Sequence, residues 1–388
     1  MDARELAGAA VLLLGTLFFG GCGDSGCSGS SGVPFENVRV MEGANLLETA
    51  SSDENVTMDL LLVSSVRQVA PDDVLVFGVS DQLPHGLLRK AVTTNDNGNG
   101  TFTVSTVQAG LGDVFRELDL CREGRLDPAE LKSSDGPLTA YAGEHTLFDF
   151  SYPIDERFGD DLLHLEGGTD FSVGYRIDIR TKTTCTLTDG CHIKIKDGTK
   201  FLLDAKADTS VTLWAGDAKS WKHSRVMYSK DFSPITIDVA GVPVVMVPEL
   251  EIIGGVKGSV DAELSTGISA SASGSVGIKY YDDEWHPYKS LNHDFDYTAP
   301  DLSASADIKA YAGPKVKLKI YDVTGPYADL YGFTKLEADI DADPWWVLYA
   351  GLESHGGFRV RVLHHTLVNV DKLIYYHQID VADAGGGL

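Results

Sequence analysis

Two long stretches of the chain alternate between apolar and polar side chains without a break. The first covers residues 261–280 and the second covers residues 302–320. Successive side chains of an extended chain point to opposite faces, so a period of two predicts β-strands and argues against helices. We therefore predict two long sister strands, each with one apolar face. The large side chains expected on these faces are Leu264, Ile268, Ile308, Val316 and Leu318.

Shorter alternating or apolar runs fill much of the remaining chain. They include residues 169–180 and a hairpin whose arms, 87–92 and 101–107, flank a loop of Asn, Asp and Gly. A twenty-residue strand would be about 66 Å long, far beyond ordinary strands. We therefore expect bends, and the residues where a bend costs least are Gly267, Gly274, Gly277 and Gly313-Pro314.

Helical signals are confined to a short region between the two groups of strands. Residues 111–120 have apolar side chains at helical spacing, and Asp127-Pro128 has the composition of a helix start. The predicted fold is therefore mainly β. A small N-terminal β unit with one or two short helices precedes a large antiparallel meander of long amphipathic strands, which forms a curled sheet or an elongated sandwich.

The N-terminus has the features of an export signal. Residues 6–19 form an apolar run that is too short to span a bilayer, and small residues follow it. The sequence Phe19-Gly20-Gly21-Cys22 resembles the lipobox of bacterial lipoproteins. This resemblance implies that Cys22 carries lipid, begins the mature chain and anchors it in the cell envelope. Within the envelope, we expect the anchor to lie in the outer membrane. An ordinary cleaved secretory signal and a true membrane helix are the alternatives.

Four segments follow from these signals. We predict a signal peptide over 1–21, a Gly/Ser-rich tether over 22–34, a small β-rich domain over 35–136 and a long-stranded antiparallel β domain over 137–388. A small hairpin unit at 86–115 that precedes a long-stranded region at 235–363 is similar to the arrangement in uncharacterised exported bacterial β-rich surface proteins. That resemblance implies export and an all-β body, and it brings no activity.

The formal net charge is −25, and no block of Lys and Arg interrupts the acidic balance. Phosphate groups are bound by clustered positive charge, so nucleic acid is not an expected partner. With Cys22 lipidated, four cysteines remain, and they allow three full pairings. Cys185 and Cys191 flank a turn containing Asp-Gly, so we predict a disulfide between them in an oxidising compartment. Cys27 and Cys121 are then the remaining pair.

Candidate chemistry is sparse. The loop 281–288 gathers carboxylates, an imidazole and aromatic rings, which suits a sugar or a cation, so its ligand-binding candidates are Asp282, Asp283, Glu284, Trp285 and His286. The sequence contains no metal-binding frame, nucleophile elbow, phosphate loop or dinucleotide fingerprint. We therefore expect no metal, no cofactor and no enzymatic activity.

Three hypotheses for the function follow. The first is a lipid-anchored surface protein whose β scaffold binds a partner, either carbohydrate or protein, or serves adhesion. The second is a carrier that holds a lipid or another hydrophobic small molecule in a groove lined by the apolar sheet face. The third, less favoured because the apolar faces are rich in Ala, is an outer-membrane β-barrel.

Overall fold

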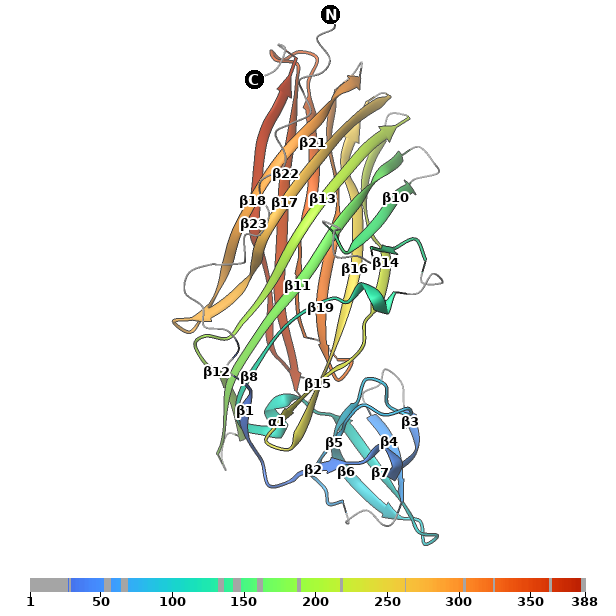
Figure 1. Cartoon of the computed structure of the whole chain (residues 1–388), viewed down its shortest axis with the longest axis vertical. Coiled ribbons are helices and arrows are strands. Elements are labelled where there is room, and N and C mark those ends of the chain that lie inside the picture. The colour runs from blue at the N-terminus through green and yellow to red at the C-terminus, as the bar shows by residue number, and fades with distance from the viewer. Residues whose placement is uncertain are drawn as a thin grey trace, which may run out of the picture.

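The computed structural model describes the backbone of residues 27, 29–51, 57–63, 69–131, 136–141, 148–158, 163–186, 190–216, 219–261, 263–302, 305–323, 325–362 and 365–384. These residues form three β-sheets (Figure 1). Two large sheets build an elongated body, and a small sheet lies at its lower end in that view. Apart from one parallel pair in the small sheet, the neighbouring strands are antiparallel.

The first large sheet has nine strands, and its main path follows the order β1-β8-β11-β13-β17-β18. Its strands are β1 (Ser31–Pro34), β8 (Phe115–Arg125), β9 (Thr139–Ala140), β10 (Phe150–Phe158), β11 (Leu163–Thr186), β12 (Gly190–Ile195), β13 (Lys200–Ala215), β17 (Leu264–Tyr281) and β18 (Glu284–Leu302).

The second large sheet has eight strands, and its main path follows the order β14-β16-β19-β20-β22-β21. Its strands are β14 (Lys219–Asp231), β15 (Ile235–Val239), β16 (Val242–Val260), β19 (Ala306–Ile320), β20 (Pro326–Asp329), β21 (Tyr331–Ala338), β22 (Trp346–Val362) and β23 (His365–Asp383).

The small sheet has six strands in the order β2-β5-β6-β7-β4-β3. They are β2 (Val38–Met41), β3 (Leu46–Ser51), β4 (Thr57–Val63), β5 (Val74–Phe77), β6 (Leu87–Asp96) and β7 (Thr101–Gln108). The described helical turns are η1 (Gly43–Asn45), α1 (Leu111–Val114) and η3 (Pro128–Glu130). The predicted hairpin is confirmed as β6 and β7, which pair directly.

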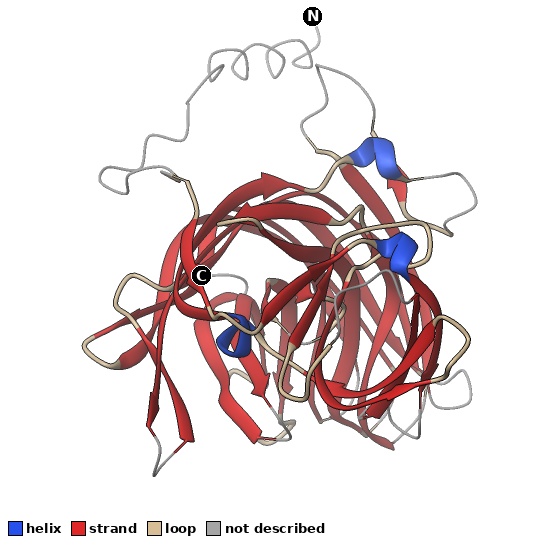
Figure 2. Ribbon diagram, turned by 90° about the horizontal axis from the view of Figure 1, so that it is seen from below, coloured by secondary structure: helices blue, strands red, loops and turns tan. Residues whose placement is uncertain are grey.

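The two large sheets face each other as a sandwich. Their strands curve around a common interior when the molecule is seen from below (Figure 2), and that interior is filled by one continuous cluster of buried side chains from both sheets. The predicted sister strands are confirmed as β17 and β19, but they belong to opposite sheets. The predicted, mainly β fold of long antiparallel strands is confirmed, and the chain crosses between the two sheets as it passes from β18 to β19.

The predicted apolar face is the inside of this sandwich. Each of its five side chains has an exposed fraction of 5% or less, and all belong to the same core cluster. Strand β17 contributes two of them and β19 contributes three. They are Leu264, Ile268, Ile308, Val316 and Leu318. Each apolar face is thus covered by the sheet opposite it.

Side chains join the sheets along both long edges of the sandwich. On one edge, the Tyr152 hydroxyl of β10 donates a hydrogen bond of 3.3 Å to the Met227 carbonyl of β14. On the other edge, the rings of His293 in β18 and His377 in β23 lie 4.5 Å apart between centroids. These contacts link the two sheets along both edges.

The boundary between the small and the large β regions differs from the prediction. The small sheet ends with β7 at Gln108, and β8 already belongs to the first large sheet, where it pairs with β11. The boundary therefore lies near 109–114 and not at 136. The predicted helix over 111–120 is also mostly wrong, because α1 ends at Val114 and pairing with β11 extends the following residues as a strand.

Two further segments bear on the sequence predictions. Asp127 begins a single 3₁₀ turn, η3, and its carboxylate accepts a hydrogen bond of 2.9 Å from the amide of Ala129. The end of the predicted tether is part of the body, because β1 pairs with β8. Backbone hydrogen bonds to the edge of β8 extend this segment as a strand, although its small side chains do not predict one. The predicted signal peptide and Cys22 lie outside the described residues.

Candidate functional site

The predicted ligand-binding loop is a tight turn between two strands. Asp282 and Asp283 occupy it with left-handed φ angles of 53° and 59°, and Glu284 begins β18. Trp285 points inward, is 8% exposed, and its ring centroid lies 5.3 Å from that of Tyr280.

His286 follows Trp285 in β18, and its ring stacks on that of Tyr281 with centroids 3.7 Å apart. Adjacent residues of a strand point to opposite faces, so Trp285 and His286 cannot converge on one ligand. The structure therefore does not bring the five predicted residues together as a site. Asp283 instead forms an ion pair with Lys194 of β12, at 3.4 Å.

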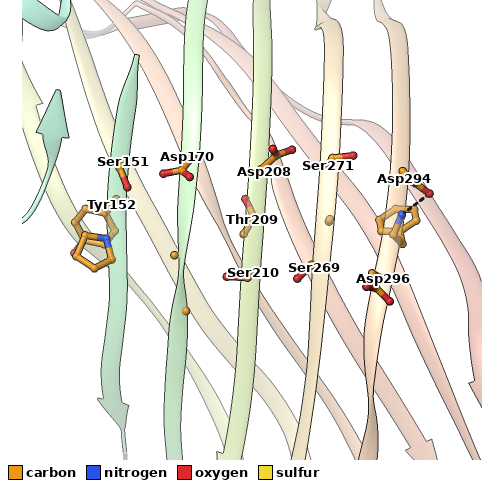
Figure 3. A pocket seen from close by; sticks show the side chains of 15 residues that line it. Ser151, Tyr152, Asp170, Asp208, Thr209, Ser210, Ser269, Ser271, Asp294 and Asp296 are labelled. Atoms are coloured by element: carbon orange, nitrogen blue, oxygen red, sulfur yellow. Dashed lines mark hydrogen bonds between the residues drawn. The ribbon is translucent and has the colours of Figure 1, made fainter. Parts of the chain in front are cut away.

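A depression of about 650 Å³ opens to solvent on the outer face of the first large sheet. It extends across five neighbouring strands: β10, β11, β13, β17 and β18 (Figure 3). Its centre is a row of directly paired residues. Ser151 pairs with Asp170, Asp170 with Asp208, Asp208 with Ser271, and Ser271 with Asp294. One row of the sheet thus presents a line of hydroxyls and carboxylates.

A second row runs parallel to the first, two residues along each strand. Its members also pair directly across the five strands, and most are small. They are Pro153, Gly168, Ser210, Ser269 and Asp296. Alternation along each strand places both rows on the outer face, while the row between them faces the core. Because Ser, Gly and Asp are short, the outer face is hollow at this position.

Glycine contributes to the hollow by close approach of two backbones. Gly167 has a φ of 150°, and a Cβ atom at this position would lie 2.1 Å from the carbonyl oxygen of Ser210. No larger residue fits this contact between β11 and β13 without displacing a strand. The sequence therefore favours a tight, side-chain-poor junction beside the depression.

The electrostatic character of the depression is acidic. Four of its fifteen lining residues are Asp, and none is Lys or Arg. Partial burial raises the pKa of the Asp208 carboxyl, and the neighbouring Asp170 raises it further against the opposing effect of Lys206. The hydroxyl of Tyr141 lies 3.5 Å from Oδ1 of Asp170. The site therefore offers hydrogen-bond acceptors and negative charge to a polar ligand.

Local sequence patterns do not indicate this site. Ser269 and Ser271 lie at polar positions of the alternating stretch 261–280, and polar positions of that kind usually only face water. Their proximity to Asp170 and Asp208 depends on pairing between strands far apart in the chain. A cross-strand register is the only signal that identifies the row, and local periodicity does not contain it.

The structure bears on both predicted cysteine pairings. Cys27 and Cys121 form a disulfide with a Cα–Cα distance of 5.4 Å. Cys185 and Cys191 are direct partners in the β11–β12 hairpin, and Cys185 is disulfide-bonded. The side chain of Cys191 lies outside the described side chains, so the bridge between Cys185 and Cys191 stays a prediction with a compatible backbone register.

A separate ionic cluster lies where β20, β21 and β22 meet. His355 is placed between two carboxylates, with Nδ1 at 3.3 Å from Asp329 and Nε2 at 3.2 Å from Glu353. Asp329 is 3% exposed and also accepts a hydrogen bond of 2.7 Å from the Tyr331 hydroxyl. Lys309 completes the cluster through an ion pair with Glu353.

Hydrogen bonds to Asp329 and Glu353 raise the pKa of His355 to about 10. The hydrogen bond from His355, together with Lys309, lowers the pKa of Glu353 to about 2. Both groups thus stay charged over the whole neutral range. We therefore interpret the cluster as an ion-pair network that stabilises the fold. Its groups do not change protonation state near neutral pH.

The substitution His355→Gln tests how much this ion-pair network contributes to stability. We expect it to lower the free energy of unfolding at neutral pH by about 2 kcal/mol, a value reduced for the partial exposure of the imidazole. The raised pKa contributes stability that is complete below about pH 6.5 and is lost as pH rises through about 10. Urea unfolding from pH 6 to pH 10 measures both effects.

His286→Gln is the matched control, because that imidazole stacks on an exposed tyrosine at a hairpin end. It should keep the loss of stability that the native protein shows as pH rises toward about 10, because His355 is unchanged in this variant. If the stability of His355→Gln depends on alkaline pH in the same way as that of the native protein, the stabilising role assigned to the ion-pair network is wrong. Acid unfolding supplies a second check, since the contribution of Glu353 is present above about pH 4.5 and is lost as pH falls through about 2.

The fold defines this chain as an antiparallel β-sandwich protein with an appended small sheet, and the acidic depression is its candidate site. No protein-family model matches the chain, and no curated protein or solved structure matches it. Among the described residues, no helix has the length and apolar character needed to cross a membrane. In the same part of the chain, no group of three His, Cys, Asp or Glu side chains is arranged to hold a metal ion.

Proposed function

We propose that this chain is an exported, non-enzymatic protein, anchored to the cell envelope by lipid on Cys22, which binds carbohydrate in the depression on its first large sheet. The observation that carries the proposal is the paired row from Ser151 to Asp294. This row holds hydroxyls and carboxylates at fixed spacing on a sheet backed by a filled core. Rigid placement of polar groups lowers the entropy cost of binding.

Carbohydrate suits this arrangement because each sugar presents several hydroxyl groups. A carboxylate such as Asp208 accepts hydrogen bonds from them, and a serine such as Ser271 both donates and accepts. The four carboxylates also favour a sugar that carries an ammonium group over a neutral sugar. The depression is open to solvent, which suits recognition of a long chain at a surface better than catalysis in a closed site.

The carrier hypothesis receives no support from the packing. The five side chains that would line its groove lie in the core between the two sheets. A hydrophobic ligand would reach them only if the sheets separated, which would expose the apolar surface that stabilises the sandwich.

The test is binding by isothermal titration calorimetry to residues 23–388 exported without the anchor. The probes are cello-, chito- and chitosan oligosaccharides, which differ in charge and in acetylation. We expect measurable binding, tightest for the cationic chitosan oligomers. Asp208→Asn combined with Ser271→Ala should weaken binding at least about tenfold, because it removes one negative charge and one hydroxyl group.

Asp282→Asn is the control, because it removes one charge at the distant hairpin turn and Asn tolerates the left-handed backbone there. It should bind like the native protein. Absence of binding to every probe refutes carbohydrate recognition, and release of reducing ends refutes the non-enzymatic assignment. Mass spectrometry of the full-length product tests the anchor, since the mature chain should begin at a lipid-modified Cys22.

A further inference from the structure

Trp214 stands on the same outer face as the depression. Strand β13 alternates along its length, and Asp208, Ser210, Thr212 and Trp214 all point away from the core. Trp214 is 49% exposed. Tryptophan is rarely left so open to water, because its large ring gains much from burial.

The path from the depression to Trp214 is free of large side chains on β13 and β17. Thr212 and Gly267 are direct partners between the second row of the depression and the Trp214 row. Trp214 itself pairs with Ser265 of β17 and with His164 of β11. At about 3.3 Å per residue, Trp214 lies about 20 Å from Asp208 along the strand.

We infer that Trp214 is a ligand-binding residue, and that the ligand is a linear oligosaccharide lying along β13 from the Asp208 row to the Trp214 ring. This inference rests on the proposed function. The polar row binds hydroxyl or ammonium groups of one end of the oligosaccharide. The exposed indole stacks against the apolar face of a sugar ring several units further along.

The inference makes affinity depend on ligand length. A monomer or dimer reaches only the polar row, whereas a longer oligomer also reaches Trp214. Stacking on one aromatic ring corresponds to about tenfold in affinity. Affinity should therefore rise about tenfold with chain length until the ligand spans both groups.

The experiment measures dissociation constants for chitosan oligosaccharides from dimer to hexamer with the native protein, Trp214→Ala and Trp214→Phe. Trp214→Ala should bind the dimer as the native protein does and should lose the gain with length, and Trp214→Phe should keep part of it. Tyr281→Ala is the matched control, because Tyr281 is 45% exposed near the far end of the same sheet. It should keep the full gain.

The outcomes separate the two proposals. If neither these oligomers nor the cello- and chito-oligosaccharides bind, the proposed function fails and the inference fails with it. If the dimer binds and Asp208→Asn weakens it, but Trp214→Ala keeps the full gain with length, only the inference is overturned. Thermal unfolding of each variant should match the native protein, because Trp214 is a surface position.

Discussion

Replacing Cys27 and Cys121 together by Ser should lower the free energy of unfolding by about 4 to 5 kcal/mol. The bridge joins residues 94 apart in the sequence, and in the chain-entropy model a closed loop of that length restricts the unfolded chain by about this amount. The loop contains the whole small sheet. The bridge also holds the start of the described chain beside β8, where β1 pairs.

Guanidinium unfolding of the double variant measures this loss. The native protein unfolded in dithiothreitol should show the same free energy of unfolding if the Cys27–Cys121 bridge contributes most of the stabilisation by disulfides. A double substitution of Cys185 and Cys191 is the comparison. The loop between them is short, so the same model gives about 2 kcal/mol. An unfolding midpoint that stays unchanged in the Cys27 and Cys121 double variant would contradict the role of the long loop.

Local periodicity predicted the long strands well because their environment is two-sided. In β17 and β19, one face contacts the core and the other contacts water, so apolar and polar residues alternate. The same local pattern did not indicate which sheet each strand would join. Sheet membership depends on pairing between distant segments, such as β13 with β17 and β16 with β19.

Strand β18 shows where periodicity fails. It is the last strand on the path of its sheet, and several of its inward positions remain partly exposed. Selection for apolar residues is weak at such an edge, and Pro287 and charged side chains occur where a central strand would have Val or Ile. The first residues of β18 therefore have the composition of an exposed loop, although Trp285 packs in the core cluster.

The candidate site could not be predicted from the sequence for a related reason. Asp170 and Asp208 are unremarkable among fifty-seven acidic residues, and only the register of β11 against β13 makes them neighbours. The disulfide between Cys27 and Cys121 could not be predicted for the same reason. These residues are 94 apart in the sequence, and the sequence offers them only as the pair that remains after Cys185 and Cys191. The glycines named for bends lie inside the continuous strands β17 and β19, and Gly274, Gly277 and Gly313 occur where the neighbouring backbone approaches too closely for a side chain.

Gly274 is the position at which this requirement is strongest for the predicted bends of β17. Its φ of 141° is unfavourable for residues with a Cβ atom, and a Cβ here would lie 1.9 Å from the carbonyl oxygen of Ser290 in β18. That oxygen belongs to the backbone, so the strand itself must move. We expect Gly274→Ala to lower the free energy of unfolding by about 4 kcal/mol, as the sum of backbone strain and overpacking.

Gly332→Ala is the control for this substitution, because its nearest new contacts would be ordinary ones, 3.6 Å from Ala270 and 3.7 Å from Thr209. It should leave stability within about 1 kcal/mol of the native value, since the smaller entropy of the unfolded chain offsets small adjustments. Guanidinium unfolding compares the two variants. Gly274 lies three positions from Ser271, so strand displacement in Gly274→Ala should also disturb the polar row. Equal stability of the two variants would show that β18 moves freely against β17. It would also contradict the fixed spacing on which the proposed carbohydrate binding rests.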